Sequence, residues 1–336
     1  MAQREMPDVN AAADTPLLRV EDLKVHFPVY AGAILPRQTG SVKAVDGVSF
    51  EIRRGETFAI VGESGCGKSS MAMAVLGMLP KTSGRIIFDG TDITDFSAER
   101  MRPIRRRMQT VFQDPFSSLN PRMKVGDIIA EPLVVHRAAQ DPGARRARVA
   151  ELMALVGLLP QMAHRYPHEF SGGQRQRISI ARALALEPDL VICDEAVAAL
   201  DVSIQAQILN LLMDLQRRLG LAYLFISHDL SVVRHISDRI GVMYLGRMVE
   251  TGSREALFAS PQHPYTQALL AAVPVPDPEA VAPPPSSLLR GEPPSARNPP
   301  AGCRFHPRCV HAMPKCKDEE PALRHHGATE AACHLV

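Results

Sequence analysis

The sequence has no long apolar run and no excess of charge of either sign. No stretch approaches the ~18 consecutive apolar residues that a membrane-spanning helix needs, and residues 1–5 lack the apolar core of a signal peptide. The 38 Lys and Arg residues nearly balance the 36 Asp and Glu residues, so the net charge is +2 and nothing draws the whole surface to nucleic acid or anionic lipid. We therefore expect a chain that remains in the cytosol and binds no nucleic acid.

Aromatic residues are also few, and none interleaves with the arginines at 102–107 and 145–148. Because single-stranded nucleic acid is bound by basic side chains combined with aromatic stacking partners, these arginines are expected on solvated helix faces. What the sequence does have is length and apolar content. Its 336 residues, 46% of them hydrophobic, can bury a substantial core in two or three domains.

Residues 62–69 read G-x-x-x-x-G-K-S, between an apolar run at 58–61 and a helical run at 70–76. This order is typical of the phosphate-binding P-loop, whose backbone N–H groups and helix start bind an anion. The alternative is a glycine turn that precedes a helix by chance. Lys68 would contact the β- and γ-phosphates, and Ser69 would ligate Mg²⁺. The expected nucleotide contacts are Gly62, Glu63, Ser64, Gly65, Cys66, Gly67, Lys68, Ser69 and Ser70.

Polar side chains follow three further apolar runs. Gln113 ends the first, where its amide can ligate Mg²⁺, hold the attacking water or be an ordinary surface group. Asp194 and Glu195 end the second; the first is placed to hold Mg²⁺ and the second to act as a base, unless both are turn residues. His228 follows the third run, and we expect it at the γ-phosphate rather than in a structural role.

A second anion-binding helix start is expected at residues 171–174. Ser171 can cap this helix, Gly172 and Gly173 allow a close approach, and Gln174 completes the Ser-Gly-Gly-Gln sequence.

Alternating residues at 17–27 and 49–52 predict an antiparallel sheet, with a loop at 31–41 between its strands. On this pattern Phe27 can pack in the core or stack on adenine. The P-loop helix is expected to stop at Pro80. Helical periodicity within 116–170 predicts a helical insertion.

The end of the chain is rich in proline and then in cysteine. Prolines crowd residues 274–300, which predicts a linker. The cysteines beyond it have the spacing C-x5-C-x6-C-x16-C, which is typical of neither a zinc ribbon nor a ferredoxin. Four thiols can still ligate zinc or an iron–sulfur cluster, or hold no metal. The candidate ligands are Cys303, Cys309, Cys316 and Cys333, with His306, His311 and His334 as substitutes.

In order and spacing, these motifs resemble an ABC transporter ATPase subunit. The Ser-Gly-Gly-Gln sequence is the discriminating part. Within that family, residues 17–336 are most similar to the ATP-binding subunits of dipeptide and oligopeptide permeases. The stretches 42–50, 166–170 and 263–266 resemble the F-type of the two subunits that these permeases use.

The resemblance implies an α/β fold: a P-loop NTPase core, in which helices flank a mixed sheet, with an antiparallel β subdomain, a helical insertion and a small Cys-rich C-terminal extension. Together with the composition it divides the chain into four parts: a disordered N-terminus (1–16), an ATPase domain (17–257) with its insertion at about 116–170, a Pro-rich linker (258–300) and a Cys-rich motif (301–336).

The resemblance also implies a function and partners. The chain would hydrolyse ATP with Mg²⁺ at the cytoplasmic face of the bacterial inner membrane, to energise uptake of dipeptides or oligopeptides. The alternatives are import of nickel, glutathione or an opine, and a non-transport ABC ATPase. The implied partners are a second ATPase subunit of the D-type, two integral membrane subunits and, indirectly, a periplasmic solute-binding protein.

Carried over residue by residue, the resemblance implies that residues 171–174 of one chain cover ATP on residues 62–70 of another. It gives Glu195 the role of base, His228 the γ-phosphate, Phe27 the adenine stack, Asp201 a place at the dimer seam and Gln113 a link to the helical insertion. For some family members it also suggests a [4Fe–4S] cluster on the C-terminal cysteines. The sequence departs from the family pattern at Ala196 and Ala198, where proline and serine are usual, and neither change removes a ligand or the base.

Overall fold

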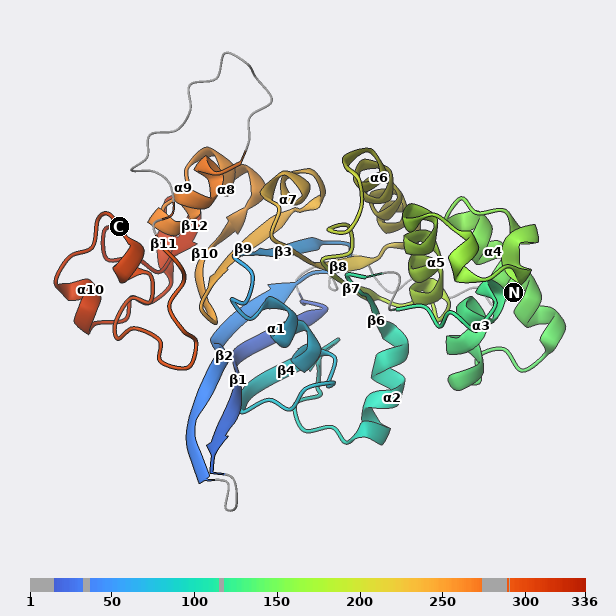
Figure 1. The fold of residues 1–336 in the computed structure, drawn as a ribbon, viewed down its shortest axis with the longest axis horizontal. Helices are drawn as coiled ribbons and strands as arrows, with labels where there is room; N and C mark the ends of the chain where they lie inside the picture. The colour runs from blue at the N-terminus through green and yellow to red at the C-terminus, as the bar shows by residue number, and fades with distance from the viewer. Residues whose placement is uncertain (1–14, 33–36, 115–117, 274–288, 290) are drawn as a thin grey trace, which may run out of the picture.

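The computed structural model describes residues 15–32, 37–114, 118–273, 289 and 291–336. The disordered N-terminus predicted for 1–16 therefore lies outside the described residues up to residue 14. Two β-sheets and a group of helices make up the fold (Figure 1). None of the helices in the described ranges combines the length and apolar character required to cross a membrane.

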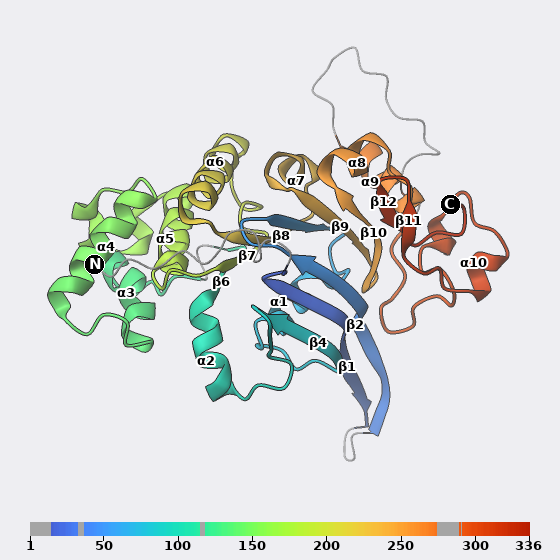
Figure 2. The same cartoon turned by 180° about the vertical axis from the view of Figure 1, so that it is seen from behind.

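The first sheet is antiparallel, as predicted, with the strand order β2-β1-β4-β5. Its strands are β1 (Leu18–Ala31), β2 (Arg37–Ile52), β4 (Ser83–Phe88) and β5 (Thr91–Asp92). The long β1–β2 hairpin projects from the body of the molecule (Figures 1 and 2). The loop predicted at 31–41 is wrong at residue 31, which ends β1, and at 37–41, which begin β2: Ala31 pairs with Arg37 and Pro28 with Ser41.

The second sheet is mixed and has the order β11-β12-β10-β9-β3-β8-β7-β6. Five of its strands are parallel to one another: β3 (Thr57–Val61), β6 (Met108–Val111), β7 (Leu190–Asp194), β8 (Ala222–Ser227) and β9 (Arg239–Tyr244). The other three are β10 (Arg247–Ser253), β11 (Arg324–His326) and β12 (Thr329–Ala331). Every residue of β3 and β8 is buried, as expected for parallel strands covered on both faces.

Helix α1 (Lys68–Val75) follows β3 after a six-residue loop and packs, with residues of both sheets, into one hydrophobic core. It ends well before Pro80, where the sequence predicted its end. Gly77 takes a φ of +64°, and the N–H groups of Gly77 and Met78 donate to the carbonyls of Ala74 and Met73. This glycine C-cap satisfies the last carbonyls of the helix, so the helix ends there and not at the proline.

A second core joins the parallel strands to most of the remaining helices, whereas Met101, in the helix before β6, packs in the first core. The predicted insertion contains α3 (Val125–Val135), α4 (Pro142–Leu155) and the short 3₁₀ turns η1 (Pro160–His164) and η2 (Pro167–Glu169). The other helices between the strands are α2 (Ala98–Arg107), α5 (Gly172–Leu184), α6 (Val202–Leu219) and α7 (Leu230–Ile236). Helices α3, α4 and α5 lie at the end of the molecule opposite α10 (Figure 1).

The C-terminal part of the chain is built onto the main sheet. It contains α8 (Arg254–Ala259), α9 (Pro264–Ala271), the 3₁₀ turn η4 (His306–Arg308) and α10 (Lys315–Asp318), and β12 pairs with β10. The linker predicted for 258–300 is wrong at its start, which forms helix α9. This segment folds because it is anchored by the fully buried ring of Tyr265, which packs against Tyr244 and Phe305. Most of 274–300, from 274 to 288 and at 290, lies outside the described residues.

Candidate functional site

The P-loop connects the end of β3 to the start of α1. A Cβ on Gly67, whose φ is +107°, would lie 1.9 Å from the carbonyl oxygen of Ala44 on β2. A Cβ on Gly62 would lie 2.2 Å from the carbonyl oxygen of Met243 on β9. The two glycines are therefore required because the backbones of both sheets approach the loop closely.

Lys68, the first residue of α1, folds back over the loop. Its Nζ donates to the carbonyl oxygens of Gly62 at 2.7 Å and Glu63 at 3.0 Å, and the residue is only 4% exposed. Gly67, at the N-cap of α1, provides no side-chain cap. The loop thus combines an ammonium group with the positive end of a helix dipole, an arrangement that suits a phosphate.

Ser69 and Asp194 meet at the mouth of the loop. The Oγ of Ser69 donates to Oδ1 of Asp194 at 3.0 Å, which joins the start of α1 to the end of β7. Burial raises the pKa of Asp194, and the neighbouring Glu195 raises it further, against the opposing effects of Ser69 and Lys68. A hydroxyl and a carboxylate are hard oxygen ligands of the kind that Mg²⁺ takes beside a nucleotide, so these side chains fit the predicted metal.

Glu195 lies between Gln113 and His228. The Nε2 of Gln113 donates to Oε2 of Glu195 at 2.8 Å, and Nδ1 of His228 lies 3.3 Å from Oε1. Glu195 takes a φ of +49°, and its N–H donates to the carbonyl oxygen of Ile226 on β8. Because the parallel strands β6, β7 and β8 end at one edge of the sheet, three side chains that are distant in sequence form one cluster.

Residues 171–174 form the N-terminus of α5. The Oγ of Ser171 accepts from the N–H of Gln174, and Oε1 of Gln174 accepts from the N–H of Ser171, which makes a capping box. A Cβ on Gly173 would lie 2.5 Å from Cγ2 of Ile204 on α6. Among the described residues, neither Ser171 nor Gln174 makes a side-chain hydrogen bond to the P-loop of its own chain.

Phe27 is half-buried on β1 and packs against the core that contains α1. This is the core position that periodicity favoured, and an adenine stack stays a prediction. The adjacent His26 places Nε2 2.8 Å from Oδ1 of Asp46 on β2.

Four residues outside the sequence motifs support the site through hydrogen bonds: Asp46, Tyr265, Arg304 and Arg308. The hydroxyl of Tyr265 accepts from the N–H of Glu63 at 2.9 Å, and Arg308 makes two bonds to the Glu63 carboxylate. Arg304 donates to Asp46. Tyr265 lies in the run 263–266, which the sequence marks only through a resemblance, and Arg304 and Arg308 lie between the candidate metal ligands Cys303 and Cys309. Their partners lie far away in the sequence, so no local pattern identifies them.

The four C-terminal cysteines lie in one region, and all are free thiols. Burial raises the pKa of Cys303 to about 11 and raises the pKa values of Cys309 and Cys333, and neighbouring thiols add to each shift. Within the described ranges, however, no three His, Cys, Asp or Glu side chains form a group that could hold a metal ion. The described side chains thus form no preassembled site for an iron–sulfur cluster or a zinc ion.

Two family models match the chain. One, described as ABC transporter, matches residues 45–198, and the other, described as oligopeptide/dipeptide transporter, C-terminal region, matches residues 249–316. The chain is 52% identical to the oligopeptide transport ATP-binding protein AppF of Bacillus subtilis, over 97% of this chain and 99% of that protein. It is 48% identical to the dipeptide transport ATP-binding protein DppF of Escherichia coli, over 98% of both chains.

Solved structures show the same fold. The cbiO1 subunit from Clostridium perfringens, part of an ABC transporter complex, is 30% identical and superposes with a TM-score of 0.63, over 73% of this chain and 91% of that one. An ATP-binding cassette in a dimeric post-hydrolysis state, bound to ADP and phosphate, is 28% identical with a TM-score of 0.62, over 70% and 98%. The chain belongs to the ATP-binding proteins of oligopeptide and dipeptide ABC transporters.

Proposed function

We propose that this chain binds MgATP on residues 62–70 and hydrolyses it to energise the import of dipeptides or oligopeptides. The proposal rests on side chains that meet at one edge of the sheet. Gln113 and His228 contact the two carboxylate oxygens of Glu195. The preceding residue, Asp194, accepts a hydrogen bond from Ser69 of the P-loop helix. A base, a metal-binding pair and a phosphate loop in this order are the parts that phosphoryl transfer to water requires.

Each side chain has a role in this proposal. Lys68 donates to the β- and γ-phosphate oxygens, because a charge-assisted hydrogen bond from a buried ammonium to phosphate is strong. Ser69, Asp194 and Gln113 hold Mg²⁺, which neutralises charge that develops on the phosphates. Glu195 orients the attacking water and accepts its proton, with His228 beside the γ-phosphate.

The second half of each site comes from a partner chain in this proposal. Ser171 is exposed and, within the part of the chain that the structure describes, its hydroxyl and the Gln174 amide bond only in the cap of their own helix, so this helix start can cover ATP on another P-loop. The dimeric state of a solved relative supports this arrangement. Asp201, exposed at the start of α6, would lie at the seam.

The finer assembly is also a proposal. We infer a heterodimer with a D-type ATPase subunit at the cytoplasmic face of the inner membrane, bound to two membrane subunits that the helical insertion contacts. Peptide-stimulated, vanadate-sensitive ATP hydrolysis by the reconstituted transporter with its solute-binding protein tests this function. Stimulation by nickel, glutathione or an opine, and not by peptides, would reassign the cargo.

An iron–sulfur cluster on Cys303, Cys309, Cys316 and Cys333 is a separate proposal that rests on the resemblance and on their common location. No described group of three ligands supports it. Protein purified anaerobically would absorb near 400 nm if the cluster is present, and Cys309→Ser would remove the band. Colourless wild-type protein would reject the cluster, and stoichiometric zinc in that protein would identify the alternative metal.

A further inference from the structure

The segment 303–309, which begins and ends with two of the four C-terminal cysteines, contacts the P-loop. Arg308, near its end, reaches Glu63 in the loop with two bonds: Nη1 to Oε2 at 2.6 Å and Nη2 to Oε1 at 3.0 Å. The Arg308 side chain is 5% exposed and that of Glu63 is 25% exposed. Such a two-pronged pair fixes orientation as well as distance, and partial burial limits its screening by water.

Glu63 is held a second time through its backbone. The buried hydroxyl of Tyr265 accepts from the Glu63 N–H, and Tyr265 packs against Tyr244, over whose ring the Arg308 guanidinium lies at 5.8 Å. The carbonyl of Glu63, in turn, accepts from Lys68. A continuous set of contacts therefore runs from the C-terminal region through Glu63 to the lysine that receives the phosphates.

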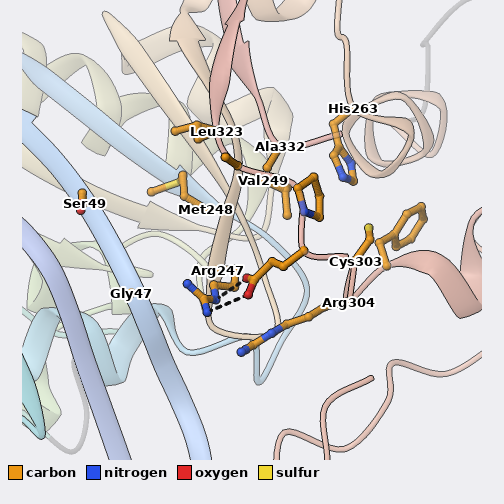
Figure 3. Close-up of a pocket in the computed structure, with 14 residues that line it drawn as sticks. Gly47, Ser49, Arg247, Met248, Val249, His263, Cys303, Arg304, Leu323 and Ala332 are labelled. Atoms are coloured by element: carbon orange, nitrogen blue, oxygen red, sulfur yellow. Dashed lines mark hydrogen bonds and ion pairs between the residues drawn. The ribbon is translucent and has the colours of Figure 1, made fainter. Parts of the chain in front are cut away.

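Arg304, four residues before Arg308, anchors the same segment to β2. It donates to Asp46 and to the carbonyl oxygen of Leu245, and it is 8% exposed. Arg247, which lies beside Arg304 in Figure 3, pairs with Glu320 of the C-terminal region, and all three residues line a cavity of about 380 Å³. The segment is thus fixed at both arginines, so Arg308 is presented to Glu63 from a rigid support.

We propose that Arg308 is a positioning residue of the ATP site: through Glu63 it sets the place of Lys68, and so the C-terminal region determines nucleotide affinity. This rests on the proposed function, which places the nucleotide on residues 62–70. Without Arg308, the Glu63 carboxylate loses its buried partner and turns toward water, and the backbone that holds Lys68 shifts with it. Misplacing a phosphate ligand by a fraction of an ångström weakens binding without changing the bound groups.

The test is titration calorimetry of the full chain with MgADP, which reports affinity without turnover. Arg308→Met should raise the dissociation constant about tenfold. Arg308→Lys keeps the charge but makes at most one of the two bonds, so its dissociation constant should lie between those of the wild type and Arg308→Met. It takes the place of Arg308→Met if that variant fails to fold. The matched control, Arg324→Met, removes a positive charge from an exposed position of the C-terminal region and should leave the affinity unchanged.

A double-mutant cycle distinguishes an effect of Arg308 that acts through Glu63 from a general loss of structure in the C-terminal region. If Arg308 acts through Glu63, adding Arg308→Met to Glu63→Gln should weaken MgADP binding little beyond Glu63→Gln alone. Unchanged affinity in Arg308→Met, or the same loss in both backgrounds, overturns the proposal. Lys68→Ala distinguishes failure of the proposed function from failure of the positioning role. If Lys68→Ala does not weaken MgADP binding, the nucleotide does not bind at the P-loop. If Lys68→Ala weakens MgADP binding and Arg308→Met does not, only the positioning role is rejected.

Discussion

The side chains of Gln113 and Glu195 are joined by a 2.8 Å hydrogen bond, although the two residues are 82 positions apart in the chain. Gln113 follows β6 and Glu195 follows β7, and the parallel pairing of these two strands brings their ends together. In the proposed function Gln113 donates to the base Glu195 and also ligates Mg²⁺, so its substitution tests both assignments.

Removing the amide donor should impair hydrolysis more than binding. In Gln113→Glu the side chain keeps its shape but can no longer donate, and a second negative charge faces Glu195. We expect turnover to fall by about 10²-fold, with a smaller loss in Gln113→Ala. Steady-state ATPase assays and MgADP titration check this. Wild-type turnover in Gln113→Glu would show that the hydrogen bond has no catalytic part.

Neutralising the proposed base should separate binding from chemistry. Glu195→Gln preserves the hydrogen-bonding shape but cannot accept a proton, so hydrolysis should fall by about 10³-fold while MgATP still binds and holds the two chains together. Turnover and size-exclusion chromatography with MgATP measure the two effects. The control Glu255→Gln, on the exposed face of α8, should behave as wild type. Normal hydrolysis in Glu195→Gln would refute the assignment of the base.

The affinity for Mg²⁺ should depend on pH in a way that reflects the raised pKa of Asp194. Burial raises the pKa of Asp194, so its protonation begins at a higher pH than for an ordinary aspartate, and Mg²⁺ affinity should decline from that pH downward. Ligand titrations of ATP-bound protein across pH measure this decline. An Mg²⁺ affinity that stays constant until the range of an unperturbed carboxyl would contradict it.

The same raised pKa predicts an effect on stability. The folded chain takes up a proton at Asp194 more readily than the unfolded chain, so this group favours folding at low pH and loses that contribution as pH rises through its folded pKa. Asp194→Asn should therefore raise the midpoint of thermal unfolding at pH 7 without nucleotide while abolishing Mg²⁺ affinity. An unchanged or lowered midpoint would show that the weaker acceptor that a neutral amide offers to Ser69 outweighs the relief of the buried charge.

Cys66 should act as a reporter of the phosphate cradle. Its side chain is 4% exposed, and burial raises its pKa, so alkylation should be slow at neutral pH and accelerate as pH rises. MgATP should slow it further, as measured by peptide mass spectrometry. Cys193, fully buried with a pKa raised to about 12, should stay unlabelled throughout. Equal labelling of Cys66 with and without MgATP would contradict the cradle.

Two glycines of the P-loop offer a matched comparison. Both Gly65 and Gly67 have positive φ, but a Cβ on Gly65 meets no atom within 4 Å, whereas one on Gly67 meets the Ala44 carbonyl. Gly65→Ala should cost about 1–2 kcal/mol of unfolding free energy from backbone strain alone. Gly67→Ala should cost clearly more, because β2 must move. Denaturant titrations that give equal losses would contradict the close approach.

The sequence predicted the site best where function depends on local order. A P-loop needs a strand, glycines and a helix in immediate succession, and the polar residues at 113, 194–195 and 228 each end an apolar run, so adjacency in the chain determines their place. The β1–β2 hairpin was partly missed because residues 37–39 are exposed, and their pairing leaves no hydrophobic alternation. The early end of α1 was missed because Pro80 was the stronger signal, although Gly77 carries the cap.

What the sequence could not predict are the contacts made across the whole chain. Arg308 meets Glu63 across 245 positions, and Arg304 meets Asp46 across 258. Such pairs follow from how the C-terminal region lies on the main sheet, which depends on the packing of Tyr265 and Phe305 and has no periodicity to reveal it.

The pairing of β12 with β10 limits how far this chain can be shortened. Glu250, on β10, is fully buried, and its carboxylate accepts from the N–H groups of Gln262 and His263 and from the hydroxyl of Thr329. A fragment that stopped after β10 would expose a strand edge and leave the buried Glu250 side chain without its donors, which favours aggregation. A recombinant form of this ATPase therefore needs the chain that follows β10, as far as β12, to keep Glu250 paired.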